Sequence, residues 1–544
     1  MRGAKSAKWV AIAAVVALSV TACGGGGDDG GDKGNDKGAV DAKGIVTFES
    51  GEPQNPLQPA NTMESYGSDV VTSLFDTLVD YENGSGKITY TNAESITTDD
   101  SKVWTVKLKS GWKFHNGEAV TAKSYVDAWN WAANIANNQT NASWFSDIEG
   151  YADVHPEKGK AKKDAMSGLK VVDDSTFTIT LSAPLAYFEY KLAYNVFAPL
   201  PSGFFKDPEG YGEKPVGNGP YEFVKWDHKK SIQVKTYAGY KGPNKAKNGG
   251  VLFKNYTGPE ASYADLLSDK VDVIRQVPAA SLANYKTDLG DRAVDQDYSA
   301  VQSIVPAFYT KQWKGIDNRV LQGLSMAIDR DTITKTVLQD TRTPATGWVA
   351  QGVLGFKAGA AGDVTKYNPA EAKKLIKAGG GVPGNKISIQ FNADGGHGEW
   401  VEAVCNSIRE ATGVECSGDS KADFQTDLEA RDAKEVKSMY RGGWVLDYPF
   451  NGNFLRDLYG TGVAGNTSGY SNKDFDALVK DADGAPTIEK SAELYQQAEK
   501  SLVDNMPSIP LWYYKVNSGY SNNVQNVKFN QAGDPILNEI EVKK

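Results

Sequence analysis

Residues 103–122 read VWTVKLKSGWKFHNGEAVTA, and this stretch predicts a strand, a turn and a helix in direct succession. Apolar and polar residues alternate from Val103 to Leu108, as in a half-buried strand. Gly111 and Gly117 mark the turn, and Thr121 is a favourable N-cap for the helix that follows. That helix would bury one apolar face, made of Tyr125, Val126, Trp129 and Ala132.

The rest of the chain repeats this alternation. Strands are predicted at 44–49, 176–181, 387–391 and 508–516, and helices at 68–81, 318–329, 369–378, 399–411 and 488–503. No repeat of fixed period is present. About 500 residues form this body, which is too long for one hydrophobic core. The pattern predicts an α/β protein of two or three domains around a cleft.

The N-terminus has the features of a secretory signal. Residues 1–22 carry Arg2, Lys5 and Lys8, then a short apolar run and small residues before Cys23. The segment resembles a bacterial lipobox, which implies a lipid attached to Cys23 as the mature N-terminus. The alternative is an ordinary signal followed by an unrelated cysteine. Residues 23–43 are rich in Gly, Asp and Lys and are expected to form a flexible, lipid-anchored tether.

The charge of the chain argues against nucleic acid as a partner. The formal net charge is −9, and the signal removes three cations and no acids. An acidic protein favours solubility and mildly favours cationic ligands.

Cys405 and Cys416 are predicted to form a disulfide. A helix over 399–411, ended by Gly413, would run directly into a strand that contains Cys416. A helix packed against the strand that follows it can bring two such cysteines within bonding distance in a secreted protein. A metal site is the weaker alternative, because no histidine or third cysteine is near in sequence.

The stretch 441–450, RGGWVLDYPF, combines two opposite charges with two aromatic rings. Arg441 can hold a carboxylate with its planar fork, and Asp447 can accept from an ammonium group. Trp444 and Tyr448 add the rings. Two glycines and a proline favour a strand that runs into a turn. The stretch suits a zwitterionic ligand, but a buried strand whose charges satisfy local loops would have the same pattern.

Several blocks of sequence together resemble one family, the bacterial extracellular solute-binding proteins of the peptide/nickel type. The most extensive match is 103–122. The other blocks are Pro215–Tyr221, Leu324–Arg330, Ser468–Asn472 with Phe475-Asp476, and Pro507–Tyr514. They occur in the family's order and together span nearly all of residues 44–544. The family includes oligopeptide- and dipeptide-binding lipoproteins of ABC importers.

The resemblance implies an α/β fold, a two-lobed periplasmic-binding-protein-like clamshell with a third domain inserted in the first lobe. Lobe 1 would comprise 44–86, 201–300 and 509–544, the inserted domain 87–200, and lobe 2 residues 301–508. Chain crossings near 300 and 508 would form the hinge. The ligand would be held between the lobes.

The resemblance also implies roles for the stretch 441–450. Asp447 would pair with a peptide ammonium group and Arg441 would serve the carboxylate side, while Trp444 lines the cleft. The ring of Tyr448 is a further candidate. Trp144 and Phe145, in a stretch that matches the family loosely, are candidates for rings near the ammonium group. Asn451-Gly452 departs from the family, where many members carry a second acidic residue.

The expected partners are a peptide ligand, permease subunits and, through Cys23, the outer face of the membrane, with the protein a monomer. The alternatives are an oligosaccharide- or metal-chelate-binding member of the family and a receptor for peptide signals. No cofactor is expected. An enzyme is not expected either, because the four histidines form no catalytic or metal-protease motif and the GxGxxG of 460–465 does not open a helix.

Overall fold

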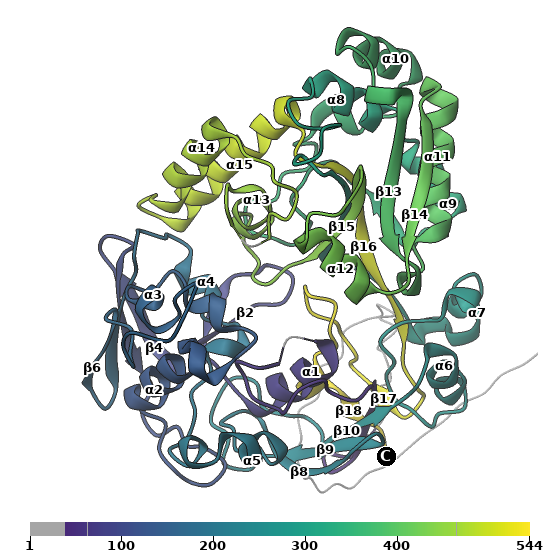
Figure 1. The fold of residues 1–544 in the computed structure, drawn as a ribbon. Coiled ribbons are helices and arrows are strands. Elements are labelled where there is room, and N and C mark those ends of the chain that lie inside the picture. Colours follow the sequence, from purple (N-terminus) through teal and green to yellow (C-terminus); the bar gives the residue numbers. More distant parts are fainter. Residues whose placement is uncertain (1–38, 63, 464) are drawn as a thin grey trace, which may run out of the picture. The chain divides into compact units, whose positions relative to one another are not determined.

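The computed structural model of the protein describes residues 39–62, 64–463 and 465–544 (Figure 1). The predicted signal segment, Cys23 and the tether up to residue 38 lie outside the described residues. The last residues assigned to the tether contact the C-terminal segment, since Asp41 N–H donates to Val542 O at 2.8 Å. Within the part of the chain that the structure describes, no helix is both long and apolar enough to cross a membrane.

The first sheet has four strands in the order β1-β10-β9-β8. They are β1 (Ile45–Ser50), β10 (Gly250–Asn255), β9 (Ser231–Thr236) and β8 (Tyr221–Asp227). β1 and β10 pair in parallel, and the other two pairs are antiparallel. Alternation in β1 turns Phe48 inward, where its ring meets that of Phe253 at 6.1 Å. Four helices come before or after these strands along the chain: α1 (Ser65–Leu74), α5 (Pro208–Glu213), α6 (Pro259–Leu267) and α7 (Tyr285–Leu289).

The helix predicted at 68–81 is wrong in its second half. Helix α1 stops at Leu74 because Phe75 is extended, and β2 (Val79–Tyr81) pairs with β3 (Ile88–Tyr90). Tertiary contacts hold the intervening turn. Asp76 N–H donates to Asn218 Oδ1 at 3.1 Å, and Tyr240 donates its hydroxyl to Asp76 Oδ2 at 2.6 Å. Contacts with residues so distant in sequence override the local helical pattern.

The second sheet confirms the prediction for 103–122. Its antiparallel strands have the order β4-β5-β7-β6: β4 (Ala93–Thr98), β5 (Val103–Leu108), β7 (Thr176–Thr180) and β6 (Leu169–Asp173). Helix α2 (Ala122–Ala133) begins after Thr121, whose N–H donates to Ser124 Oγ at 3.1 Å. Tyr125 and Trp129 of α2 pack their rings on Phe177 of β7. Two single-turn helices, α3 (Tyr151–Val154) and α4 (Phe188–Lys191), occur in the same part of the chain.

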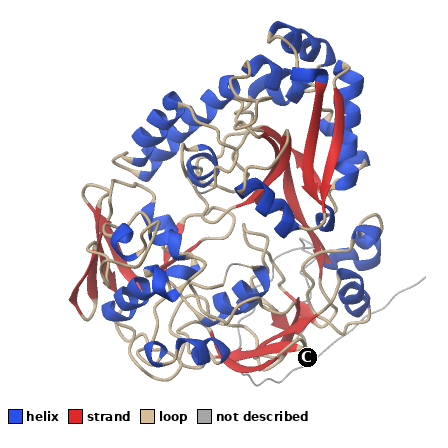
Figure 2. Cartoon of the chain, in the orientation of Figure 1, coloured by secondary structure: helices blue, strands red, loops and turns tan. Residues whose placement is uncertain are grey.

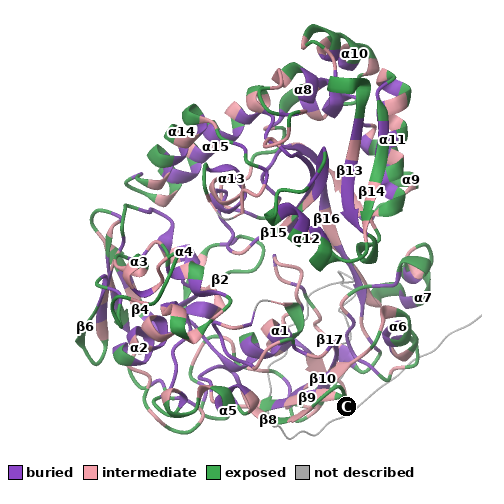
Figure 3. Cartoon of the chain, viewed as in Figure 1, coloured by how far each residue is buried: buried purple, intermediate pink, exposed green. Residues whose placement is uncertain are grey.

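The third sheet is mixed and has six strands in the order β12-β16-β11-β15-β13-β14. They are β12 (Arg342–Pro344), β16 (Ile509–Gly519), β11 (Ala293–Pro306), β15 (Met439–Val445), β13 (Lys386–Asn392) and β14 (Glu415–Lys421). β13 runs parallel to β14 and β15, and β11 is antiparallel to β15 and β16. β13 is largely buried, whereas β14 at the sheet edge is mostly exposed (Figure 3).

Helices supply the other layers around this sheet (Figure 2). They are α8 (Asn318–Met326), α9 (Arg330–Thr336), α10 (Pro369–Ala378), α11 (Gly398–Thr412), α12 (Phe424–Asp432), α13 (Gly452–Tyr459), α14 (Lys473–Asp483) and α15 (Ile488–Asn505). Helix α11 packs on β14, and α8 packs on α10. The C-terminal hairpin is β17 (Val524–Gln525) with β18 (Glu541–Val542).

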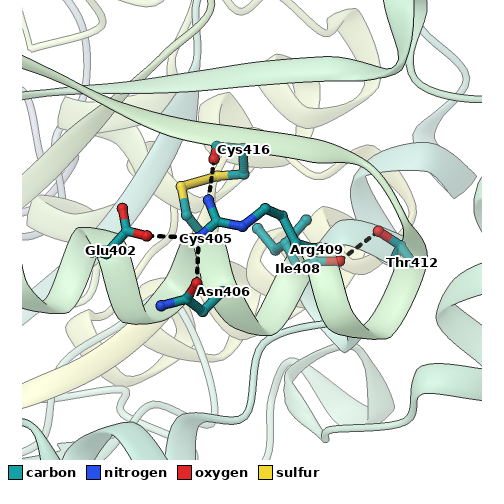
Figure 4. Close-up of a disulfide and its surroundings, with 7 residues drawn as sticks. All are labelled: Glu402, Cys405, Asn406, Ile408, Arg409, Thr412 and Cys416. Atoms are coloured by element: carbon teal, nitrogen blue, oxygen red, sulfur yellow. Dashed lines mark hydrogen bonds and ion pairs between the residues drawn. A yellow bond between two sulfur atoms is a disulfide. The ribbon is translucent and has the colours of Figure 1, made fainter.

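Cys405 of α11 and Cys416 of β14 form a disulfide in the structure (Figure 4). Their Cα atoms are 4.9 Å apart, and both residues are buried. The guanidinium group of Arg409 donates to the carbonyl oxygen of Cys416 beside the bond. The bond therefore joins the helix to the outermost strand of the third sheet.

Loss of this disulfide is expected to destabilise the protein. A loop this short contributes roughly 2–3 kcal/mol in the chain-entropy model. The protein with Cys405 and Cys416 both replaced by Ser should unfold at a lower temperature than the parent, and a reductant should lower the unfolding temperature of the parent alone. Two free thiols in the protein purified under oxidising conditions would contradict the assignment.

Candidate ligand-binding site

The stretch 441–450 forms the end of β15 and the turn before α13. Leu446 N–H donates to Ser299 O at 3.0 Å, beside β11. Backbone groups alternate in direction along a strand, so those of Arg441, Gly443 and Val445 point to the opposite edge. There β13 pairs only with Met439 and Tyr440. Beyond Tyr440 this edge has no strand partner among the described residues.

Asp447 follows this open edge and is half-buried. Its Oδ2 accepts from Asn453 Nδ2 at 3.0 Å, and no described residue forms an ion pair with it. Burial raises the pKa of Asp447 to about 7; the hydrogen bond from Asn453 opposes this, and the nearby Asp457 adds to it. A carboxylate in this position lacks a cation, and an ammonium group would supply one.

Arg441 lies within β15 and is buried. Its Nε donates to Asn392 Oδ1 at 3.0 Å, and its guanidinium group lies over the ring of Phe424, 5.0 Å from the centroid. A Cβ added to Gly443 would be 3.2 Å from Arg441 Nη1, so the side chain extends along the strand over Gly443. No carboxylate pairs with Arg441 in the described chain. Burial, followed by the charge of Arg431, lowers its pKa.

A histidine and two further arginines lie near Arg441. His397 accepts from Trp400 Nε1 at 3.0 Å, and burial together with the charges of Arg441, Arg342 and Arg431 lowers its pKa to about 4. Arg431 is paired with Asp427, whereas Arg342 lies over the ring of Tyr514. Sequence reasoning missed Arg342 and Arg431, because only the tertiary packing of strand β12 and helix α12 brings them near Arg441.

The two rings of the stretch have different environments. Trp444 is half-buried, and its Nε1 donates to Asn453 Oδ1 at 3.1 Å. Tyr448 is only 1% exposed, donates its hydroxyl to Asp457 Oδ2 at 2.6 Å and stacks on Tyr187. Tyr448 is therefore a core residue beside the site and presents almost no surface to a ligand.

Trp144 and Phe145 also differ. Both belong to the 3-10 helix Ala142–Phe145. Trp144 is half-buried, stacks on Tyr194 with ring centroids 3.9 Å apart and lies edge-on to Tyr448 at 6.4 Å. Phe145 is fully buried against Trp129 and has no exposed surface for a ligand. The structure thus brings Trp144, but not Phe145, to the loop that carries Asp447.

The middle of the chain matches a known protein family. The family model described as bacterial extracellular solute-binding proteins, family 5 Middle, matches residues 87–466. The chain belongs to this family. The predicted α/β fold and the predicted family are therefore both confirmed.

Individual relatives extend this likeness over the whole body. The solute-binding protein is 25% identical to the oligopeptide-binding protein OppA of Bacillus subtilis over 530 residues, 93% of each chain. It is 26% identical to the dipeptide-binding protein DppE of the same organism over 432 residues, 76% of each chain. The structure of Haemophilus influenzae OppA in complex with RPPGFSPFR matches with a TM-score of 0.73 at 23% identity, covering 93% of this chain and 100% of the other.

A network of ion pairs lies near Asp447 in this solute-binding protein. Arg456 of α13 contacts Asp147 at 3.2 Å, Asp483 at 3.3 Å and Asp457 at 3.5 Å. Lys191 also pairs with Asp147. Burial would raise the pKa of Asp147, but these two cations outweigh it and hold the pKa at about 2. The cations are thus committed to other acids, which leaves Asp447 without a partner. No group of three or more His, Cys, Asp or Glu among the described residues could hold a metal ion.

Glu499 of α15 is a buried carboxyl group whose ionisation should make the stability of the fold depend on pH. It is 1% exposed, and its Oε1 accepts from the N–H groups of Trp348 at 2.9 Å and Val349 at 3.1 Å. Burial raises its pKa to about 7. Between about pH 4.3 and pH 7, Glu499 therefore binds more protons in the folded protein than in the unfolded chain. The contribution of Glu499 to the free energy of unfolding falls as the pH rises through that window.

Glu499→Gln should remove this pH dependence, because an amide oxygen can still accept both N–H groups. In thermal unfolding experiments, the unfolding temperature of the variant relative to that of the parent should rise between pH 5 and pH 7 and level off toward pH 8. Parallel profiles for the two proteins would show that Glu499 ionises normally in the fold.

Proposed function

We propose that this protein captures oligopeptides or dipeptides by their charged ends and delivers them to the permease of an ABC importer. The observation that carries the proposal is the pair Asp447 and Arg441. Arg441 lies in β15 and Asp447 lies in the turn that follows this strand, and neither forms an ion pair with an opposite charge among the described residues.

The open edge of β15 fits an extended peptide. The backbone groups of Arg441, Gly443 and Val445 face this edge, and Val445 is 45% exposed. An extended chain can add to such an edge through main-chain hydrogen bonds. Gly443 has no side chain, so the guanidinium group of Arg441 can lie over it along the strand.

Recognition through chain ends and backbone explains how such a site could accept varied sequences. Every unmodified linear peptide has an ammonium group and a carboxylate. Charge-assisted hydrogen bonds to these groups are worth about 1.5–3 kcal/mol each. Trp144 and Trp444 offer aromatic surface beside Asp447, and water can fill the remaining space around different side chains.

We assign the working location to the outer face of the bacterial membrane. The support is the sequence of residues 1–23, in which a secretory signal leads to Cys23 as the site of lipid attachment. Acyl chains add about 0.8 kcal/mol of membrane affinity per buried methylene. We expect a monomer, with no cofactor and no catalytic residues.

The domain ranges inferred from the family likeness remain part of the proposal. Lobe 1 is assigned 44–86, 201–300 and 509–544, the inserted domain 87–200 and lobe 2 residues 301–508. The two proposed crossings fall within β11 and at the start of β16, and these strands pair with each other over most of their length.

Ligand-induced thermal stabilisation tests the proposed function. Free peptides of two to nine residues should raise the unfolding temperature, because ligand at about 100 times Kd adds ~2.7 kcal/mol. The same peptides with both ends capped should act far more weakly. Stabilisation by oligosaccharides or nickel chelates, with none by peptides, would overturn the proposal in favour of the other ligand classes. Hydrolysis of a bound peptide would reveal an enzyme.

A further inference from the structure

We infer that Asn453 is a positioning residue for the site at which Asp447 would bind the ammonium group of a peptide. Its amide holds both the carboxylate of Asp447 and the ring of Trp444 in place. The inference rests on the proposed function, because it names the residue that aims Asp447 at a ligand. Asn453 is in the first turn of α13 and is fully buried. It acts through other residues and has no surface of its own for a ligand.

The amide of Asn453 makes four hydrogen bonds. Its Oδ1 accepts from Trp444 Nε1 at 3.1 Å and from the N–H of Asp447 at 2.9 Å. Its Nδ2 donates to Asp447 Oδ2 at 3.0 Å and to Asp457 Oδ2 at 3.1 Å. Two partners can only donate, and the ionised carboxylates can only accept, so one orientation of the amide satisfies all four.

The amide of Asn453 lies between two neighbouring acids, Asp447 and Asp457. One hydrogen of Nδ2 goes to each carboxylate, and Asp457 is further satisfied by Tyr448 and Arg456. Asp447 receives only the bond from Asn453 on Oδ2, which leaves Oδ1 without a partner among the described residues. The amide thus fixes one oxygen of Asp447 and leaves the other for an incoming donor.

The electrostatic surroundings agree with this role. The groups that face Asp447 are Asp457 of α13, Lys191 of α4 and the phenols of Tyr81 and Tyr194. Burial is the main cause that raises the pKa of Asp447, and the hydrogen bond from Asn453 is the main cause that opposes it. Without Asn453, the carboxyl group should ionise at a higher pH.

Asn453→Ala is therefore expected to weaken binding of a peptide with a free amino terminus by about 10- to 100-fold at pH 7. The N-acetylated form of the same peptide should lose little affinity. When Asp447→Asn is already present, Asn453→Ala should not further change the ratio of the affinities for the free and the N-acetylated peptide, because Asn453 acts through Asp447. Equal losses for both peptides, or additive losses in the double variant, would overturn the inference.

Asn248 provides a matched control. It is 1% exposed and also makes four hydrogen bonds, with its Oδ1 accepting from Tyr221 and Gly250 and its Nδ2 donating to the carbonyls of Leu537 and Ile540. It lies beside the first sheet, away from β15. Asn248→Ala should destabilise the fold without changing the preference for a free amino terminus. A change in that preference would show that general destabilisation accounts for the effect of Asn453→Ala.

A measurement on the ligand-free protein separates this inference from the proposed function. The carboxyl ¹³C resonance of Asp447, identified by its loss in Asp447→Asn, should titrate at a higher pH in Asn453→Ala than in the parent. An unchanged titration would overturn the positioning role even if peptides bind. A shifted titration in a protein that binds no peptide would support the role of Asn453 and refute the proposed ligand.

Discussion

Asp447→Asn is expected to weaken binding of peptides with a free amino terminus by about 100-fold. The substitution keeps the shape of the side chain, and its amide oxygen can still accept from Asn453. It removes the negative charge that a buried ammonium group needs, and loss of one partner of a buried charge pair costs about 2–5 kcal/mol. Calorimetry or fluorescence titration of one peptide with free and acetylated ends measures the effect.

The acetylated peptide is the control in this experiment. It has no ammonium group, so its affinity should be nearly the same for the parent and Asp447→Asn. Equal weakening of both peptides would refute the assigned role of Asp447. A collapse of the fold would instead favour a structural role, and thermal unfolding of the ligand-free variant distinguishes these outcomes.

Arg441→Ala is expected to weaken peptides with a free carboxylate by about 10- to 100-fold, with little effect on C-terminally amidated peptides. The guanidinium group already lies along β15 over Gly443, with only its Nε bonded to another described residue. It can therefore present its Nη atoms to a carboxylate without breaking an ion pair. Titration with a matched pair of free and amidated peptides checks this.

Arg319→Ala controls for the general loss of positive charge. Arg319 is exposed and paired with Asp317 at the start of α8. Its removal changes the net charge by the same amount but should leave the affinity of both peptides unchanged. If Arg441→Ala and Arg319→Ala behave alike, long-range electrostatics accounts for the effect and the specific role is wrong.

Local patterns predicted much of the fold. The alternation at 103–108 and the cap at Thr121 depend on residues close in sequence, and β5 and α2 form where expected. The helix expected through residue 81 failed because contacts of Asp76 with Asn218 and Tyr240 are not visible in a local pattern.

The candidate site was predicted less completely, for the same reason. The stretch 441–450 showed its charges and rings, but not which rings would be buried. Tyr448 packs on Tyr187, whose position in the sequence gives no hint of the contact. Asn453 was missed because its role depends on how α13 turns back toward Asp447. The sequence departs from the family at Asn451-Gly452, where many members carry a second acidic residue, and Asp457, one helical turn beyond Asn453, is the acid that lies beside Asp447.

If Asp447 holds a peptide ammonium group as proposed, ligand capture would be coupled to the release of protons. With a pKa of about 7 in the ligand-free protein, this group is partly protonated near neutrality. An ammonium group held against it would favour the ionised form, so uptake of each peptide would expel a fraction of a proton into the surrounding fluid. Acid surroundings would then oppose loading, and a host that acidifies its medium would weaken its own peptide capture.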